Sequence, residues 1–411
     1  MLRSMFSAIS GLRAHQTKMD VTGNNIANVN TVGFKSQQTV FQDTLSQVIR
    51  AGGAPAADRG GTNPAQVGLG VKVAATTTNW TQGATQSTGR STDFMIEGDG
   101  FFVTRSGTES LYTRAGSFDF DGEGKLVTPN GGVLQGWMAN AAGVVNSNGP
   151  VGDLTVPYGQ IVNPKQSTTG AVGGNLPAGA ATGTTYQTGV TMYDSQGVEQ
   201  KIFYNFTKAA AANTWTLDIT HDNGTALVTG ATVAFNAAGA LTTPAAPGTI
   251  APFTPPAASF PSWTGPVTVD VAAMTQFGGA STVTATDQNG YELGSLQSFQ
   301  LGNDGTIMGV YSNGLRQPLG QLALASFNNP SGLEKAGSST FRVGVNSGDA
   351  AVGLAGVGGR GVLNSGALEM SNVDLAEEFT GLIVAQRGFQ ANSRVITSSD
   401  EILQDLVNLK R

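Results

Sequence analysis

Residues 375–403 read LAEEFTGLIVAQRGFQANSRVITSSDEIL, and every seventh position of this stretch holds an apolar side chain. A repeat of seven places one apolar stripe along an α-helix, the pattern that coiled coils use. Ser371 or Asn372 is a suitable N-cap, and Asp374, Glu377 and Glu378 bring negative charge to the end that the helix dipole favours. The sequence therefore predicts an amphipathic helix over residues 372–411. Its stripe consists of Leu375, Leu382, Phe389, Ile396 and Leu403, with Phe379 widening it.

The N-terminus carries a second apolar stripe. Spacings of three and four residues predict a helix that ends near Gly23. Residues 1–50 carry mainly basic charges and residues 369–411 mainly acidic ones, so the two ends are weakly complementary. Each helix alone is compatible with covering a core in its own domain, but stripes at both extreme ends favour a terminal coiled coil. The N-terminal stripe consists of Leu2, Met5, Ile9, Leu12 and Met19.

Between the two ends the hydrophobic period changes to two, in runs such as residues 100–104 and 201–206. Turn pairs such as Asp121-Gly122 separate these runs at short intervals, which predicts a mainly β middle. Residues 223–269 contain no charged side chain and seven prolines. That composition predicts a loop-rich part of an outer domain or an exposed insertion.

Changes of pattern near residues 70, 147, 288 and 360 divide the chain into four parts. The expected fold class is mixed and mainly β, with a terminal α-helical coiled coil and two β-rich domains, the outer one inserted into the inner one. The expected ranges are 1–30 with 372–411 for the terminal helical coiled-coil domain, 31–70 with 361–371 for a connecting segment, 71–147 with 289–360 for the inner β domain, and 148–288 for the inserted outer β domain.

Composition excludes several classes of function. The formal net charge is −6 and no basic cluster occurs, so neither nucleic acid nor an anionic membrane is an expected partner. No stretch of ~18 apolar residues occurs, so membrane insertion is not expected. Cysteine is absent and the only histidines are His15 and His221, which leaves almost nothing to build a metal site or a Ser-His-Asp triad. Residues 356–361 match GxGxxG but neither follow a clear strand nor open a helix. We expect no catalysis, no cofactor and no metal.

Three blocks of sequence resemble a known family, the bacterial flagellar axial proteins of the basal body rod and hook. The blocks are NNIANVNTVGFK at 24–35, then 98–103 with 112–118 and 134–137, and finally 371–375 continuing to 386–394. They lie on both sides of the predicted insertion and in the same order as in the family. The positions that match the family signature are Asn28, Asn30, Thr31, Gly33, Phe34, Lys35, Gln386, Arg387, Gly388 and Phe389.

The length of the insertion is similar to that of hook subunits, whereas the rod subunits lack a large inserted domain. The resemblance implies a structural subunit that polymerises with itself into a bendable helical tube and, in motility, transmits torque from rod to filament. As further partners it implies distal rod subunits, hook–filament junction proteins, the hook cap and the flagellar export apparatus. It also implies an extracellular location in the hook, reached by type III export without a cleaved signal peptide.

Three alternatives stay open at this point. A distal-rod type of axial subunit shares the terminal blocks. A secreted adhesin-like protein with a coiled coil and β domains fits the same pattern but needs a secretion signal or an anchor. A secreted carbohydrate-active β protein needs carboxylates that converge in a cleft.

Overall fold

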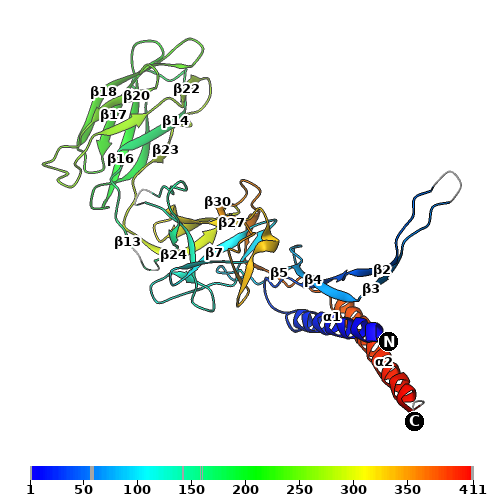
Figure 1. The fold of residues 1–411 in the computed structure, drawn as a ribbon. Helices are drawn as coiled ribbons and strands as arrows, with labels where there is room; N and C mark the ends of the chain where they lie inside the picture. Colours follow the sequence, from blue (N-terminus) through cyan, green and yellow to red (C-terminus); the bar gives the residue numbers. More distant parts are fainter. Residues whose placement is uncertain (1, 56–59, 141–142, 158, 160, 409–411) are drawn as a thin grey trace. The chain divides into compact units, whose positions relative to one another are not determined.

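The computed structural model describes residues 2–55, 60–140, 143–157, 159 and 161–408, and it is mainly β with one long helix at each end (Figure 1). The predicted fold class is confirmed to this extent. The residues form two compact units: unit 1 comprises Met1–Pro157, Phe299–Met308 and Pro318–Arg411, and unit 2 comprises Tyr158–Ser298 and Gly309–Gln317. The chain crosses between the two units after residues 298, 308 and 317. These three boundaries fall within β24 (Gly294–Leu301), β25 (Thr306–Tyr311) and β26 (Arg316–Leu322), respectively.

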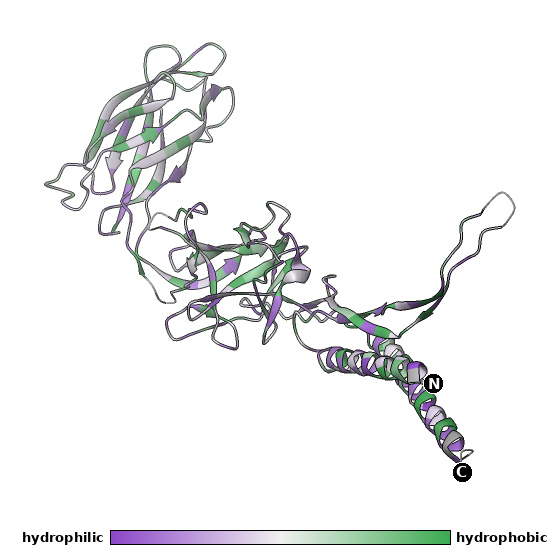
Figure 2. Ribbon diagram, in the orientation of Figure 1, coloured by the Kyte–Doolittle hydropathy of each residue, from purple (hydrophilic) through white to green (hydrophobic). Residues whose placement is uncertain are grey.

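The two terminal helices, α1 (Leu2–Ala27) and α2 (Leu375–Asn408), pack against each other in unit 1. Figure 2 shows apolar residues recurring along both of them. The α1 helix does not end near Gly23 but continues through Asn25. The predicted caps of α2 are wrong, because the Asp374 carboxylate accepts the backbone N–H groups of Ala376 and Glu377 at 2.8 and 3.2 Å. Asp374 is therefore the N-cap.

Four small antiparallel sheets join the segments beside the helices. They pair β1 (Gln37–Asp43) with β4 (Val71–Thr78), β2 (Ser46–Arg50) with β3 (Ala65–Gly68), β5 (Thr85–Ser87) with β32 (Ala367–Glu369), and β6 (Phe94–Glu97) with β31 (Val362–Ser365). The last two pairs bring together segments from opposite ends of the chain. The first pair packs on α1.

The larger sheet of unit 1 includes the order β26-β11-β7-β8-β29-β28. Aromatic rings from different parts of the chain pack together in its core. The ring of Phe101 lies against those of Phe327 and Phe341 at centroid distances of 5.6 and 6.1 Å. The remaining elements outside the two sheets of unit 2 are β7 (Phe101–Ser106), β8 (Glu109–Thr113), β9 (Asp119–Phe120), β10 (Leu126–Val127), β11 (Val133–Met138), β12 (Gly152–Asp153), β13 (Ile161–Val162), β27 (Leu324–Ser326), β28 (Glu334–Gly337), β29 (Thr340–Arg342), β30 (Ala351–Gly353) and the 3-10 helix η1 (Pro330–Gly332).

Unit 2 contains two five-stranded sheets that share one core. Alternate residues of β17, Trp215, Leu217 and Ile219, are fully buried, as a period of two requires. One sheet runs β15 (Thr185–Tyr193), β16 (Glu199–Lys208), β17 (Thr214–His221), β18 (Ala226–Phe235), β19 (Leu241–Thr243). The other contains β20 (Thr249–Phe253), β21 (Val267–Asp270), β14 (Thr169–Pro177), β22 (Met274–Phe277) and β23 (Thr284–Gln288).

The charge-free stretch 223–269 is rich in loops, as predicted, because fewer than half of its residues lie in strands, but it also contributes to a buried core. It contains all of β18, β19 and β20 and most of β21, and it contributes buried side chains such as Phe260 and Trp263 to the core of unit 2.

Candidate functional site at the two chain ends

The helices α1 and α2 run antiparallel, and their backbones approach closely at Gly11 and Gly388. Gly11 lies against Asn392, Gly388 against the ring of His15, and Asn25 bonds Glu378 near the other end of the pair. A Cβ atom added to Gly388 would lie 2.5 Å from the imidazole of His15. We call this contact surface the seam, defined by Gly11, His15 and Asn25 of α1 and Glu378, Ala385, Gly388, Asn392 and Ser399 of α2.

The described large apolar side chains of the predicted stripes are at most half-buried. Among the described side chains of α2, only Ala385 and Ser399 are buried. Of the predicted stripe, Leu375, Phe379 and Phe389 are 41, 50 and 36 % exposed. Leu382, Ile396 and Leu403 of α2 and Met5, Ile9, Leu12 and Met19 of α1 are half-buried, while the side chain of Leu2 lies outside the described residues. A role of these stripes in assembly stays a prediction.

Asn25 connects three elements. Its fully buried amide donates to the Gln37 backbone carbonyl of β1 at 2.7 Å and to the Glu378 carboxylate of α2 at 2.6 Å, and its carbonyl oxygen accepts the Gln37 N–H at 3.0 Å. Buried polar groups are stable only when they are paired in this way. These bonds hold the last turn of α1 in place, which explains why the helix passes Gly23.

A buried charge cluster lies where the chain ends meet the larger sheet of unit 1. The Lys35 ammonium contacts the Glu369 carboxylate at 2.6 Å with both side chains fully buried, and the Arg114 guanidinium lies 3.4 Å from the other carboxylate oxygen. The Lys35 ammonium also donates to the Thr81 carbonyl at 2.7 Å, and Gly83 N–H donates to Glu369 at 2.9 Å. We call Lys35, Arg114 and Glu369 the joint.

Two cations share one carboxylate in the joint, out of contact with water. Burial lowers the pKa of Lys35, and the hydrogen bond and attraction of Glu369 oppose this effect. Burial likewise lowers the pKa of Arg114, again against the attraction of Glu369. The Nε of Arg114 is buried without a hydrogen-bond partner among the described residues. Glu369 is therefore the group on which both cations depend.

Close backbone contacts and hydrogen bonds surround the joint. Gly33 has a φ of +66° and donates its N–H to the Glu369 carbonyl at 2.8 Å, and an added Cβ would lie 2.5 Å from the Ala115 nitrogen. The amide of Asn372 accepts the Ser36 N–H at 2.8 Å and donates to the Asn79 carbonyl at 2.9 Å. The segment before α2 is thus bonded to the segment after α1.

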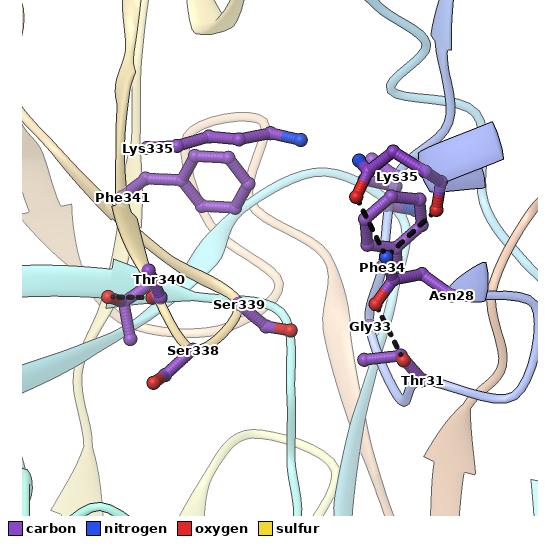
Figure 3. A pocket seen from close by; sticks show the side chains of 12 residues that line it. Asn28, Thr31, Gly33, Phe34, Lys35, Lys335, Ser338, Ser339, Thr340 and Phe341 are labelled. Atoms are coloured by element: carbon purple, nitrogen blue, oxygen red, sulfur yellow. Dashed lines mark hydrogen bonds between the residues drawn. The ribbon is translucent and has the colours of Figure 1, made fainter. Parts of the chain in front are cut away.

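The structure separates the predicted signature residues into four groups. Gly33, Phe34 and Lys35 reach the joint or its rim, while Asn28 and Thr31 bond to each other in the turn after α1 at 3.0 Å (Figure 3). Gly388 lies in the seam. Asn30, Gln386, Arg387 and Phe389 are exposed.

Sequence reasoning did not predict the roles that four residues have in the site: Asn25, Arg114, Glu369 and Asn372. Three of them, Asn25, Arg114 and Asn372, lie inside the blocks that carry the family resemblance. A polar residue is not recognisable as buried from its own neighbours in sequence, because its partners are far away in the chain. Within the described residues, no group of His, Cys, Asp or Glu is arranged to hold a metal ion, and no helix has the length and apolar character needed to cross a membrane.

Family models match four parts of the chain. Their descriptions are "Flagella basal body rod protein" for residues 5–35, "Flagellar hook protein FlgE/F/G D1 domain" for 95–175, "Flagellar basal body protein FlaE D2 domain" for 163–291, and "Flagellar basal body rod FlgEFG protein C-terminal" for 364–409. The matches cover both chain ends and residues 95–291 of the β-rich middle.

The chain is 41 % identical to the flagellar hook protein FlgE of Borreliella burgdorferi, and the alignment covers all of both chains. This chain belongs to the flagellar hook protein family. It is similar at 40 % identity to FlgE of Treponema pallidum, and at 35 % to the flagellar basal-body rod protein FlgG of Bacillus subtilis, again over all of each chain. The hook protein FlgE2 of Helicobacter pylori shares its fold, with a TM-score of 0.53 at 14 % identity over 69 % of this chain and 100 % of that one.

Removing the charge of Glu369 should cost more stability than removing that of Lys35. Glu369→Gln removes the carboxylate that both buried cations contact, so we expect the free energy of unfolding to fall by about 3–5 kcal/mol. Lys35→Met leaves Arg114 beside Glu369 and should cost clearly less. Denaturant titration of the hook-family chain measures both. Arg105→Met, which removes the part-exposed ion pair with Asp153, is the control and should cost less than about 1 kcal/mol. A loss of that small size for Glu369→Gln would contradict the role of the joint.

Alanine at two glycines of α2 should have opposite effects. Gly388→Ala puts a methyl group into the His15 ring, so we expect a loss of about 1–3 kcal/mol from overpacking. Gly381 has open space around it, so Gly381→Ala should gain up to about 1 kcal/mol from helix propensity. Thermal unfolding followed by far-ultraviolet circular dichroism measures both. Equal effects would show that the seam is not closely packed.

Acid should weaken the helix pair through His15. Burial first, and Lys18 second, lower the pKa of His15 below its ordinary 6.5, and its Nδ1 is buried without a partner among the described residues. The unfolded chain therefore takes up the proton first, and stability falls as the pH drops from 6.5 through the lowered folded value. His15→Gln removes this dependence. The difference between the two pH profiles of unfolding is the measurement, and identical profiles would refute the prediction.

Proposed function

We propose that this chain is a structural subunit of the bacterial flagellar hook, and not an enzyme, and that copies of it polymerise into a bendable helical tube that transmits torque from rod to filament. Family membership supports the hook assignment. The observation that supports polymerisation is the apolar surface that α2 leaves exposed on both sides of the seam.

That surface has two separate faces. With about 100° of rotation per residue, Leu375, Phe379 and Ile383 follow one face of α2, and Val384, Val395 and Ile402 follow another. Their exposed fractions are 41, 50, 56, 56, 42 and 51 %, respectively. The seam residues Ala385 and Ser399 lie on a third face. Apolar surface of this extent on a helix is characteristic of a protein interface.

Two faces on one helix fit two different neighbours. A contact between unlike surfaces that does not close into a ring produces an open helical assembly. Copies of this chain carry the same faces, so we assign both neighbours to second copies. In this proposal the exposed residues of the predicted stripe, Leu375, Phe379 and Phe389, act between subunits and the seam acts within each subunit.

We retain the four-part organisation of the chain as part of this proposal. The terminal helices (1–30 with 372–411) provide cohesion between subunits, and the connecting segment (31–70 with 361–371) holds the joint. The inner β domain (71–147 with 289–360) and the inserted outer β domain (148–288) provide contacts that adjust as the tube bends. Surfaces with few charges suit this role, because few ion pairs lock one register. Torque passes from the helices to the β domains through the joint.

The other partners of the subunit and its location in the flagellum are inferred from the family resemblance. We propose that the tube meets distal rod subunits at one end and hook–filament junction proteins at the other, that it grows under the hook cap, and that subunits leave the cell by type III export without a cleaved signal peptide. Identity of 35 % to a rod protein over the whole chain makes a distal-rod subunit the second candidate.

Deleting the gene separates the two candidates. We expect a strain without it to keep rods and lack hooks in electron micrographs of isolated basal bodies, and the wild-type gene to restore hooks and swimming. Missing rods would assign the chain to the rod. Intact hooks would refute both candidates.

The role of the two exposed apolar faces of α2 in polymerisation can be tested by substitution. Phe379→Gln with Ile383→Gln removes two large apolar side chains from one exposed face. Burying each such side chain contributes about 1.5–3 kcal/mol to association. We therefore expect the critical concentration for polymerisation to rise by more than about tenfold. Sedimentation of polymer from purified monomer measures this. Thr380→Gln, an exposed neighbour between the two faces, is the matched control. Unchanged polymerisation by the double variant would refute the assignment.

A further inference from the structure

A pocket of about 320 Å³ lies between the turn after α1 and the hairpin of β28 and β29 (Figure 3). The helix side contributes Asn28, Thr31 and Phe34, and the hairpin side contributes Lys335 and Ser339. In Figure 3 the Lys335 ammonium and the Ser339 hydroxyl point across the pocket toward the opposite wall. The pocket shares Lys35 with the joint, but neither the joint nor the seam uses Lys335.

Lys335 carries a charge that the fold does not neutralise. Its ammonium lies 5.0 Å from the centroid of the Phe34 ring and has no hydrogen bond or ion pair among the described residues. Lys35, which lines the same pocket, is neutralised by Glu369. Burial lowers the pKa of Lys335, and burial is its one identified cause. A partly desolvated ammonium of this kind gains more from an incoming carboxylate than a fully hydrated one does.

The hairpin adds two serines to the lining of the pocket. Ser338 and Ser339 have φ values of 51° and 58°, a region that residues other than glycine seldom occupy. The Thr113 hydroxyl holds this turn by donating to the Ser339 carbonyl at 2.9 Å. Neither serine hydroxyl makes a hydrogen bond to the rest of the described chain. Both serines line the pocket, and in Figure 3 the Ser339 hydroxyl points into it while the Ser338 hydroxyl points away from Lys335.

We propose that this pocket receives the side chain of a glutamate or aspartate from a second copy of the chain, an inference that rests on the polymerisation proposed above. The Lys335 ammonium and the Ser339 hydroxyl, which point into the pocket, can donate to a carboxylate, and the rings of Phe34 and Phe341 can contact its methylene groups. The chain supplies such groups in excess, with 28 acidic against 22 basic residues. The pocket also includes Asn24 and Asn28 at the end of α1, so its occupant adjoins a neighbour that packs on the helices.

Three substitutions of Lys335 test the proposal in the full-length chain. Lys335→Glu repels the incoming carboxylate, so we expect the critical concentration for polymerisation to rise about tenfold at low salt. Lys335→Met keeps the contact with Phe34 but removes the charge, and should raise it about threefold. Lys335→Arg should stay near the wild type. Thermal unfolding of each monomer should match the wild type, because Lys335 lies on the rim of the fold.

Lys201→Glu makes the same change of net charge at an exposed lysine of β16 and is the matched control. The proposal is overturned if Lys335→Glu polymerises as the wild type does, or if Lys201→Glu is equally impaired. It is also overturned if raising the salt concentration weakens wild-type and Lys335→Met polymers equally, because the wild-type contact should be the more salt-sensitive one. Failure of the wild-type chain to polymerise at all would instead refute the proposed function.

Discussion

The structure at the chain ends depends on one buried carboxylate. Glu369 neutralises Lys35, which is 334 residues away in sequence, and Arg114, which is 255 residues away. Burying charges is costly unless each one is paired and its remaining hydrogen bonds are satisfied, and here the Thr81 carbonyl and the Gly83 N–H meet much of that need. The two ends of the chain can therefore close only together, and they close onto the larger sheet of unit 1. Gly33, whose backbone N–H bonds the Glu369 carbonyl, is required because any side chain there would meet the Ala115 backbone.

The helix pair divides its surface between two tasks. Glycine and alanine let the backbones of α1 and α2 approach closely, and Asn25 fixes their relative position through Gln37 and Glu378. Leu382, Ile396 and Leu403 of α2 are half-buried, while several other large apolar side chains of this helix remain exposed in a single chain. Within one subunit this arrangement is costly, because apolar surface stays in contact with water. It is consistent with a subunit whose cohesion is completed by its neighbours.

Some expectations from sequence were wrong for local reasons. Asp374, and not Ser371 or Asn372, caps α2, and the amide of Asn372 instead bonds Ser36 and Asn79. All three residue types suit an N-cap, so their order in sequence does not decide which one is used. Residues 223–269 are rich in loops, as expected, but the strands among them still contribute to the core of unit 2, because the seven prolines fall mainly between strands or at their ends. Proline at such positions does not interrupt a sheet.

The sequence alone determined the helices at both ends, the mainly β middle and the family, because periods of seven and two and the signature blocks are local properties of the chain. Which face of each helix meets the other was decided only by the tertiary structure. A stripe of apolar residues records where apolar side chains lie, but not whether their partner is the same chain or another copy. The same holds for Asn25, Arg114 and Glu369, whose polar side chains are stable in the interior only because the fold brings their distant partners within hydrogen-bonding distance.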